Sequence, residues 1–111
     1  MKLRLEENSV RLRLSAAEVT QFAQTGRVAY TLVLGPAPDQ TLVYALERLE
    51  ASAPASAVQV RYAAGLLAVE VPAALAQEWT GTEKNGFSAQ IHVAESQELR
   101  ILVEKDLDCR H

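Results

Sequence analysis

The sequence predicts an α+β fold that is mostly β, in which a tandem ββαββ duplication forms one pseudo-two-fold, β-barrel-like domain with two short helices. Three observations favour this class. Apolar residues alternate with polar ones in several short runs, which is the period of strands with one buried face. A capped helical segment follows the second of these runs, and the same order of patterns returns in the second half of the chain.

The clearest local signals lie in residues 10–34. Apolar residues alternate with arginines over 10–14, and Ser15 is followed three residues later by Glu18, which is the pattern of a helix capping box. Gly26 suits the left-handed residue that ends a helix. We therefore expect a strand, a helix and a second strand in succession.

The second half repeats this organisation at one constant shift, which places each position n on position n + 57. The shift sets Phe22 on Trp79 and Ser15 on Pro72, a residue that suits a helix start. It also keeps the inward phase of all four strands without a gap, and a slip of one residue would destroy that phase. The predicted strands cover 1–6, 10–14, 27–34, 41–48, 57–63, 66–71, 87–93 and 98–105, and the helices 15–25 and 72–80.

A single domain, 1–111, follows from this repeat, with pseudo-repeats 1–48 and 58–105 and a linker over 49–57. Each half is too short to bury a stable core by itself, and each would leave open strand edges. Interleaving the hairpins of the two halves into one closed or nearly closed barrel removes those edges. We therefore expect a monomer in which the two matched helix aromatics fill the two ends of the barrel.

Residues 10–46 resemble in outline the swapped-hairpin unit of AbrB/MazE-type proteins, with strand, cap, helix, turn and hairpin in the same order. The chain carries Gly26-Arg27 where those proteins favour a Gly-Asp turn. The resemblance implies a fold and not a function, since one fold serves many functions. AbrB-like nucleic-acid binding stays open as a separate alternative for the function.

Several motifs are spread over nearly the whole chain: Met1-Lys2-Leu3-Arg4-Leu5, Asn8-Ser9-Val10-Arg11-Leu12-Arg13-Leu14-Ser15, Thr41-Leu42-Val43-Tyr44-Ala45-Leu46, Glu78-Trp79, Gly86-Phe87 and Leu102-Val103-Glu104-Lys105-Asp106-Leu107-Asp108-Cys109. These motifs are similar to a family of short uncharacterised bacterial proteins, a domain of unknown function. The resemblance implies no activity and no ligand.

Composition indicates an ordinary globular protein, with 49% hydrophobic and 23% charged residues among 111. The net charge of −3 disfavours a general polyanion binder. The single cysteine, Cys109, excludes an internal disulfide and fits a reducing compartment. Residues 1–6 alternate charge and leucine, unlike a signal peptide, and no apolar run is long enough to cross a bilayer. We expect a cytoplasmic protein without membrane association or cofactor.

The most informative feature is the charge on the first predicted hairpin. If Leu5 pairs with Val10, then Arg4 faces Arg11 on the outer surface of the sheet. In the same register Lys2 faces Arg13. Like charges directly opposite each other in a sheet are unfavourable, so an acidic group must offset them. The counterparts in the second half are Gln59, Arg61, Ala68 and Glu70, so the fold itself does not require four cations.

Two explanations of this basic hairpin remain open. Carboxylates of a neighbouring strand would neutralise it; the candidates are Glu47, Glu70, Glu104 and Asp106. Alternatively, an acidic protein or an anionic ligand binds to it. Nucleic acid is disfavoured because no aromatic residue interleaves with these cations.

The remaining candidates favour structural explanations. Cys109, His111, Asp106 and Asp108 crowd the C-terminus, but zinc ligands usually come in two paired clusters, and His92 is the one other histidine. His92 is out of phase with its apolar neighbours and should face solvent. No base on a rigid element accompanies Cys109, so no catalytic residue and no metal site is predicted.

We therefore predict a small non-enzymatic binding module whose candidate site residues are Lys2, Arg4, Arg11 and Arg13. An enzyme or small-ligand carrier is the main alternative. It would need a polar pocket of roughly 300 Å³ or more between the two halves.

Overall fold

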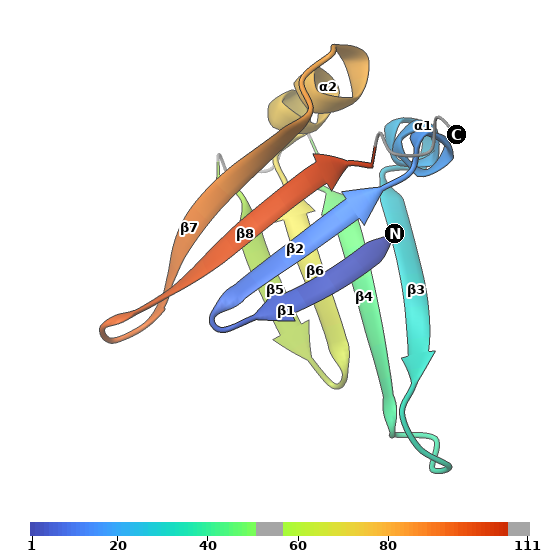
Figure 1. Ribbon diagram of the computed structural model, residues 1–111, viewed down its shortest axis with the longest axis vertical. Coiled ribbons are helices and arrows are strands. Elements are labelled where there is room, and N and C mark those ends of the chain that lie inside the picture. The colour runs from blue at the N-terminus through green and yellow to red at the C-terminus, as the bar shows by residue number, and fades with distance from the viewer. Residues whose placement is uncertain (51–56, 107–111) are drawn as a thin grey trace.

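The computed structural model describes residues 1–50 and 57–106 (Figure 1). The part of the predicted linker over 51–56 lies outside the described residues. The predicted strands and helices are all present, with small differences at their ends. They are β1 (Lys2–Glu6), β2 (Ser9–Leu14), α1 (Ala16–Thr25), β3 (Arg27–Val33), β4 (Thr41–Arg48), β5 (Gln59–Ala63), β6 (Leu66–Val71), α2 (Ala73–Gly81), β7 (Gly86–Ala94) and β8 (Gln97–Lys105).

The strands form two four-stranded sheets. Sheet A has the order β1-β2-β8-β7, and sheet B has the order β3-β4-β6-β5. Each sheet therefore combines a hairpin from the first half of the chain with a hairpin from the second, joined by a central parallel pair, β2 with β8 or β4 with β6. The hairpins of the two halves interleave, as the sequence predicts.

The two central parallel pairs have equivalent registers. Val10 lies opposite Ile101 in sheet A, and Tyr44 lies opposite Leu67 in sheet B. Adding 57 to Val10 gives Leu67, and adding 57 to Tyr44 gives Ile101, so one pair is the exchanged copy of the other. The structure thus has a ββαββ order that occurs twice, with the same register in the two parallel pairs that join the halves.

The gap-free shift fails in one strand. Val28 lies opposite Leu46, whereas Phe87 lies opposite Val103. Since Leu46 and Val103 differ by 57, the equivalent positions in β3 and β7 differ by 59. An even offset keeps each side chain on the same face of its sheet, so the predicted inward phase survives the error.

The expected barrel does not form. In the described part of the chain, β1 and β7 are the edges of sheet A, and β3 and β5 are the edges of sheet B. A layer of apolar side chains separates the sheets, and sheets packed face to face lie about 10 Å apart. Hydrogen-bonded strands must approach to about 4.8 Å, and in the described chain no edge strand of sheet A pairs with an edge strand of sheet B.

The two helix aromatics also differ from the expectation, because they meet at one end of the molecule. Phe22 and Trp79 are fully buried, and their ring centroids lie 6.0 Å apart in an edge-to-face arrangement. Figure 1 shows both helices at the same end of the two sheets. Interleaving brings the two strand–helix–strand corners together, so a separate aromatic plug at each end is not possible. The Trp79 Nε1 donates to the carbonyl of Asn85 at 3.1 Å.

The start of α1 carries the predicted capping box. The backbone N–H of Glu18 donates to the Ser15 hydroxyl at 3.2 Å, and the backbone N–H of Ser15 donates to the Glu18 carboxylate at 2.9 Å. The same carboxylate accepts hydrogen bonds from the Met1 amino group and the Tyr30 hydroxyl. Burial raises the pKa of Glu18, but these hydrogen bonds outweigh it and lower the pKa to about 2. Gly26 ends the helix in the left-handed conformation, with φ of 79°.

Replacing Glu18 by Gln tests this network. Gln keeps the capping geometry but removes the charge. Because the pKa in the folded state lies below the ordinary value of 4.5, the ionised carboxylate stabilises the fold above pH 4.5, and this stabilisation disappears as pH falls towards 2. We expect the free energy of unfolding to fall by about 1–2 kcal/mol at pH 7. In urea denaturation, the variant and the wild type should converge at low pH.

The control is Glu83→Gln, in the exposed turn before β7, which should leave stability unchanged within about 0.5 kcal/mol. A loss for Glu18→Gln that stays constant from pH 7 down to pH 2.5 would contradict the assigned role of the charge.

Candidate functional site

The predicted basic hairpin lies on the outer face of sheet A. The pairing of β1 with β2 sets Lys2 opposite Arg13 and Arg4 opposite Arg11, so the predicted register is confirmed. Buried residues of β2 alternate with these arginines and face the core. All four cations therefore project away from the core.

The adjacent strand β8 supplies an acidic partner for the arginines of β2. The parallel register sets Arg13 opposite Glu104. Arg11 donates two hydrogen bonds to one Glu104 oxygen, from Nε at 2.9 Å and from Nη2 at 2.6 Å. The Arg13 Nε lies 3.8 Å from the same oxygen, beyond hydrogen-bonding distance. The explanation that a carboxylate of a neighbouring strand neutralises the hairpin therefore holds for Arg11, whose partner is Glu104.

A second carboxylate, Asp106, lies just beyond the end of β8. The Lys2 Nζ is 2.9 Å from its carboxylate, and the Arg13 Nη2 is 4.0 Å away. Its backbone N–H donates to the carbonyl of Leu14 at 2.7 Å, which fixes the chain beside β2. The structure thus separates the predicted set of four, with Lys2 and Arg13 close to acidic groups at this end of the sheet.

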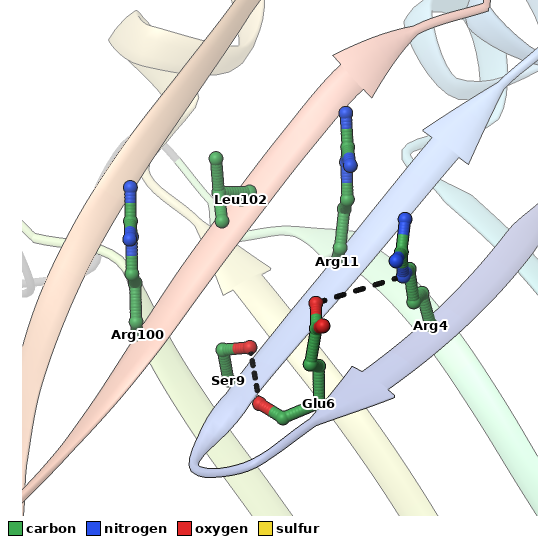
Figure 2. Close-up of a pocket in the computed structure, with 6 residues that line it drawn as sticks. All are labelled: Arg4, Glu6, Ser9, Arg11, Arg100 and Leu102. Carbon is green, nitrogen blue, oxygen red and sulfur yellow. Dashed lines mark hydrogen bonds and ion pairs between the residues drawn. The ribbon is translucent and has the colours of Figure 1, made fainter.

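The other end of the same face holds a hollow of about 270 Å³ (Figure 2). Arginines of three neighbouring strands line it: Arg4 from β1, Arg11 from β2 and Arg100 from β8. Arg4 and Glu6 are both largely exposed, with 3.7 Å between Nε and the carboxylate. Arg100 forms no ion pair with any residue of the described chain. The remaining lining residues are Ser9, whose hydroxyl donates to the carbonyl of Glu6 at 2.6 Å, and Leu102.

Arg100 was missed in the sequence because it lies in the second half of the chain. The signal was present, since Arg100 is the outward residue between two apolar inward ones, Leu99 and Ile101. The register of β2 with β8 sets Ser9 opposite Arg100. In the interleaved arrangement β8 lies next to β2, which places Arg100 beside the basic hairpin.

Sheet B provides an internal comparison, because Arg61 of β5 is the counterpart of Arg4. Arg61 donates to Glu47 at 2.9 Å and to Glu70 at 3.1 Å, and Arg27 donates to Glu47 at 2.9 Å. Burial raises the pKa of Glu47, but the hydrogen bonds from Arg27 and Arg61 outweigh it and lower the pKa. The charges on this face of sheet B are therefore paired.

The other two arginines of the hollow have apolar counterparts in sheet B. Arg11 corresponds to Ala68, and Arg100 corresponds to Val43. Two strands of the same geometry thus pair without these cations, so the fold does not require them. This difference identifies the outer face of sheet A as the candidate site.

The interior offers less chemistry. No buried residue of the described chain is polar or charged, and apolar side chains fill the space between the sheets. A hollow of about 370 Å³ does lie at the surface between the two helices, but Arg48 is the one ionisable group that lines it. The Arg48 Nη1 donates to the carbonyl of Ala23 at 3.0 Å. The hollow therefore contains no acid–base pair. Its lining residues are Ala23, Arg48, Ala73, Gln77, Thr80 and Gly81.

The other candidates add no site. His92 is exposed, as predicted, and lies opposite Glu98 in the β7–β8 pair. Cys109, Asp108 and His111 lie outside the described residues. Within residues 1–50 and 57–106, no three His, Cys, Asp or Glu side chains are grouped so that they could hold a metal ion.

The chain belongs to a family of proteins described as "Family of unknown function (DUF7009)", whose model matches residues 1–111. The predicted membership of an uncharacterised family is thus confirmed. No curated protein and no solved structure matches the chain. Neither of the described helices has the length and apolar character needed to cross a membrane.

A double-mutant cycle on Arg11 and Glu104 tests the assignment of the structural pair. Both side chains are partly buried and share two short hydrogen bonds. We expect Arg11→Gln and Glu104→Gln to show a coupling energy of about 1 kcal/mol in denaturant unfolding. The exposed pair Arg4 and Glu6, at 3.7 Å, serves as the control and should show a coupling near zero. Equal coupling in the two pairs would contradict the assignment of Arg11–Glu104 as a structural pair and of Arg4–Glu6 as a weak one.

Proposed function

We propose that this member of a family without an assigned activity is a small non-enzymatic binding module, and that the hollow on the outer face of sheet A binds an anionic group. The observation that carries the proposal is the composition of the hollow. Three arginines from three adjacent strands line it, and Glu6 is its single carboxylate. Arginine presents a planar fork of N–H donors that suits a carboxylate or a phosphate.

The arginines differ in how free they are to bind. Arg100 has no ion-pair partner in the described chain, and Arg4 has one distant partner in Glu6. Arg11 uses Nε and Nη2 for Glu104, which leaves its Nη1 for a ligand. Leu102 offers apolar contact for the carbon atoms next to the anionic group. A hollow of about 270 Å³ suits one such group and not an extended cofactor.

Nucleic acid fits this face less well. The outward residues of sheet A include no Phe, Tyr or Trp on which a base could stack. The net charge of −3 also opposes general binding to a polyanion. An isolated carboxylate or phosphate, from a small molecule or from an acidic protein segment, is the better match. The alternative of an enzyme or carrier with a site between the halves has less support, because no buried residue of the described chain is polar or charged and the hollow between the helices contains no acid–base pair.

We also infer that the two ββαββ units arose by duplication. The equal registers of the two central parallel pairs support this origin, because independent units would have no reason to share them. Comparison of the two halves across many family members tests it. Halves that show no mutual similarity in such a comparison would count against duplication.

Two substitutions with opposite expected effects on binding test the anion site. We expect Arg100→Gln to weaken binding of inorganic phosphate or citrate about three- to tenfold, because it removes the cation without a competing carboxylate. Glu6→Gln should strengthen binding by a similar factor, since it removes the one negative charge of the hollow. Chemical-shift titration by NMR measures both changes. Arg61→Gln, at the counterpart of Arg4 in sheet B, should leave binding unchanged.

Salt dependence and ligand choice complete this test. Raising the ionic strength should reduce the affinity of the wild type, because exposed charges are screened. Titration with a glutamate-rich peptide distinguishes the two kinds of ligand. A peptide that binds more tightly than citrate indicates an acidic protein partner, and the reverse order indicates a small anion. Binding that is insensitive to salt, or equally affected by Arg61→Gln, would overturn the proposal.

A further inference from the structure

The edge strand β3 carries more exposed large hydrophobic residues than any other edge of the described sheets. The exposed fraction is 41% for Tyr30, 45% for Leu32, 69% for Val33 and 66% for Leu34, which directly follows the strand. Figure 1 shows β3 along the outer side of sheet B, with no other strand beyond it. An exposed apolar edge is a surface on which another strand can pair.

The hydrogen-bond pattern shows which backbone groups face this open edge. Leu34 donates to the carbonyl of Gln40, and Arg48 donates to the carbonyl of Gly26, both at 2.8 Å. Residues of even number in β3 therefore direct their backbone groups towards β4, since these bonds alternate along an antiparallel pair. The backbone groups of Ala29, Thr31 and Val33 point outward and are available to a further strand.

The three other edges each carry a feature that discourages such pairing. Strand β1 alternates charges at Lys2, Arg4 and Glu6, and β5 has five residues with Arg61 at its centre. Strand β7 has an irregular register between His92 and Ala94. Charges, short length and bulges all protect an edge.

By contrast, β3 is unprotected. It spans seven residues in unbroken register, and it contains no proline and no charge after Arg27. The free backbone groups of such an edge can pair with a strand of another chain.

We propose that β3 pairs antiparallel with β3 of a second copy of this chain, which joins two B sheets into one eight-stranded sheet. A register centred on Thr31 sets Thr31 of the two copies opposite each other. Ala29 then lies opposite Val33 of the second copy, and Tyr30 lies opposite Leu32. Small residues meet larger ones on one face, and an aromatic residue meets an aliphatic one on the other, a favourable cross-strand combination.

Charge supports a second copy as the occupant. In this register Arg27, which also pairs with Glu47 of its own chain, lies beside the loop 34–40 of the second copy, where Asp39 is the one charged residue. No like charges meet along the paired strands. The equivalent pairing through β1, centred on Arg4, would set two arginines against each other. The self-complementary edge is therefore β3.

Open edges also remove the argument for a monomer, which depended on a closed barrel. An interface made by one strand pair and its exposed side chains lies at the small end of specific interfaces, below about 1,200 Å². The dimer should therefore form reversibly and depend on protein concentration. The β3 edge and the hollow of sheet A lie on different sheets, so this inference does not depend on the anion site.

Sedimentation equilibrium over a range of concentrations tests the inference. We expect the wild type to dimerise and Thr31→Lys to weaken the dimer at least about tenfold, because two lysines would face each other across the pair. The matched control is Gln90→Lys, at the structurally equivalent position of β7, which should dimerise like the wild type. Mixing Thr31→Lys with Thr31→Glu should restore association as a heterodimer.

Circular dichroism and thermal unfolding establish that each variant is folded. Val33→Lys, a second substitution at an exposed position of β3, should also weaken the dimer. A wild type that stays monomeric at every concentration would overturn the inference. So would a dimer that Thr31→Lys and Val33→Lys leave intact, or one that Gln90→Lys disrupts equally.

Discussion

The parallel pairing of β2 with β8 and of β4 with β6 is the constraint on which the rest of the structure depends. Each half of the chain supplies one strand to each pair, so neither sheet exists without both halves. The register of these pairs decides which outward side chains become neighbours. It brings Glu104 to Arg11 and Glu70 to Glu47, residues that are far apart in the sequence. The electrostatics of both outer faces follow from this one arrangement.

The two sheets share this geometry and differ in charge. On sheet B, Arg27 and Arg61 each have a carboxylate within hydrogen-bonding distance, so exposed cations and anions largely cancel. On sheet A, Arg13 stands where sheet B has Glu70, and a cation replaces an anion at the same structural position. The resulting excess of arginine is a property of the side chains and not of the backbone. A function on this face could therefore change without any change in the fold.

Sequence patterns predicted the local structure well and the long-range structure less well. The capping box at Ser15, the left-handed Gly26 and the Arg4–Arg11 register all depend on residues close in sequence, where geometry leaves few choices. The contact between Phe22 and Trp79, and the failure of the sheets to close, depend on how two layers pack. Arg100 was not predicted as a site residue because its place also depends on long-range pairing. The other charged residues of the hollow come from the first hairpin, at the opposite end of the chain.

Because the sheets stay open, the cations of sheet A have a further structural explanation. Lys2 and Arg4 lie on an edge strand, where charge prevents unwanted pairing, so their presence alone does not indicate a ligand. Arg11 lies on a central strand but has its own carboxylate in Glu104. Arg100 has neither explanation, because β8 is paired on both sides and no described acidic group reaches its guanidinium. The case for a binding site on this face is therefore strongest at Arg100, the residue that local sequence patterns did not identify.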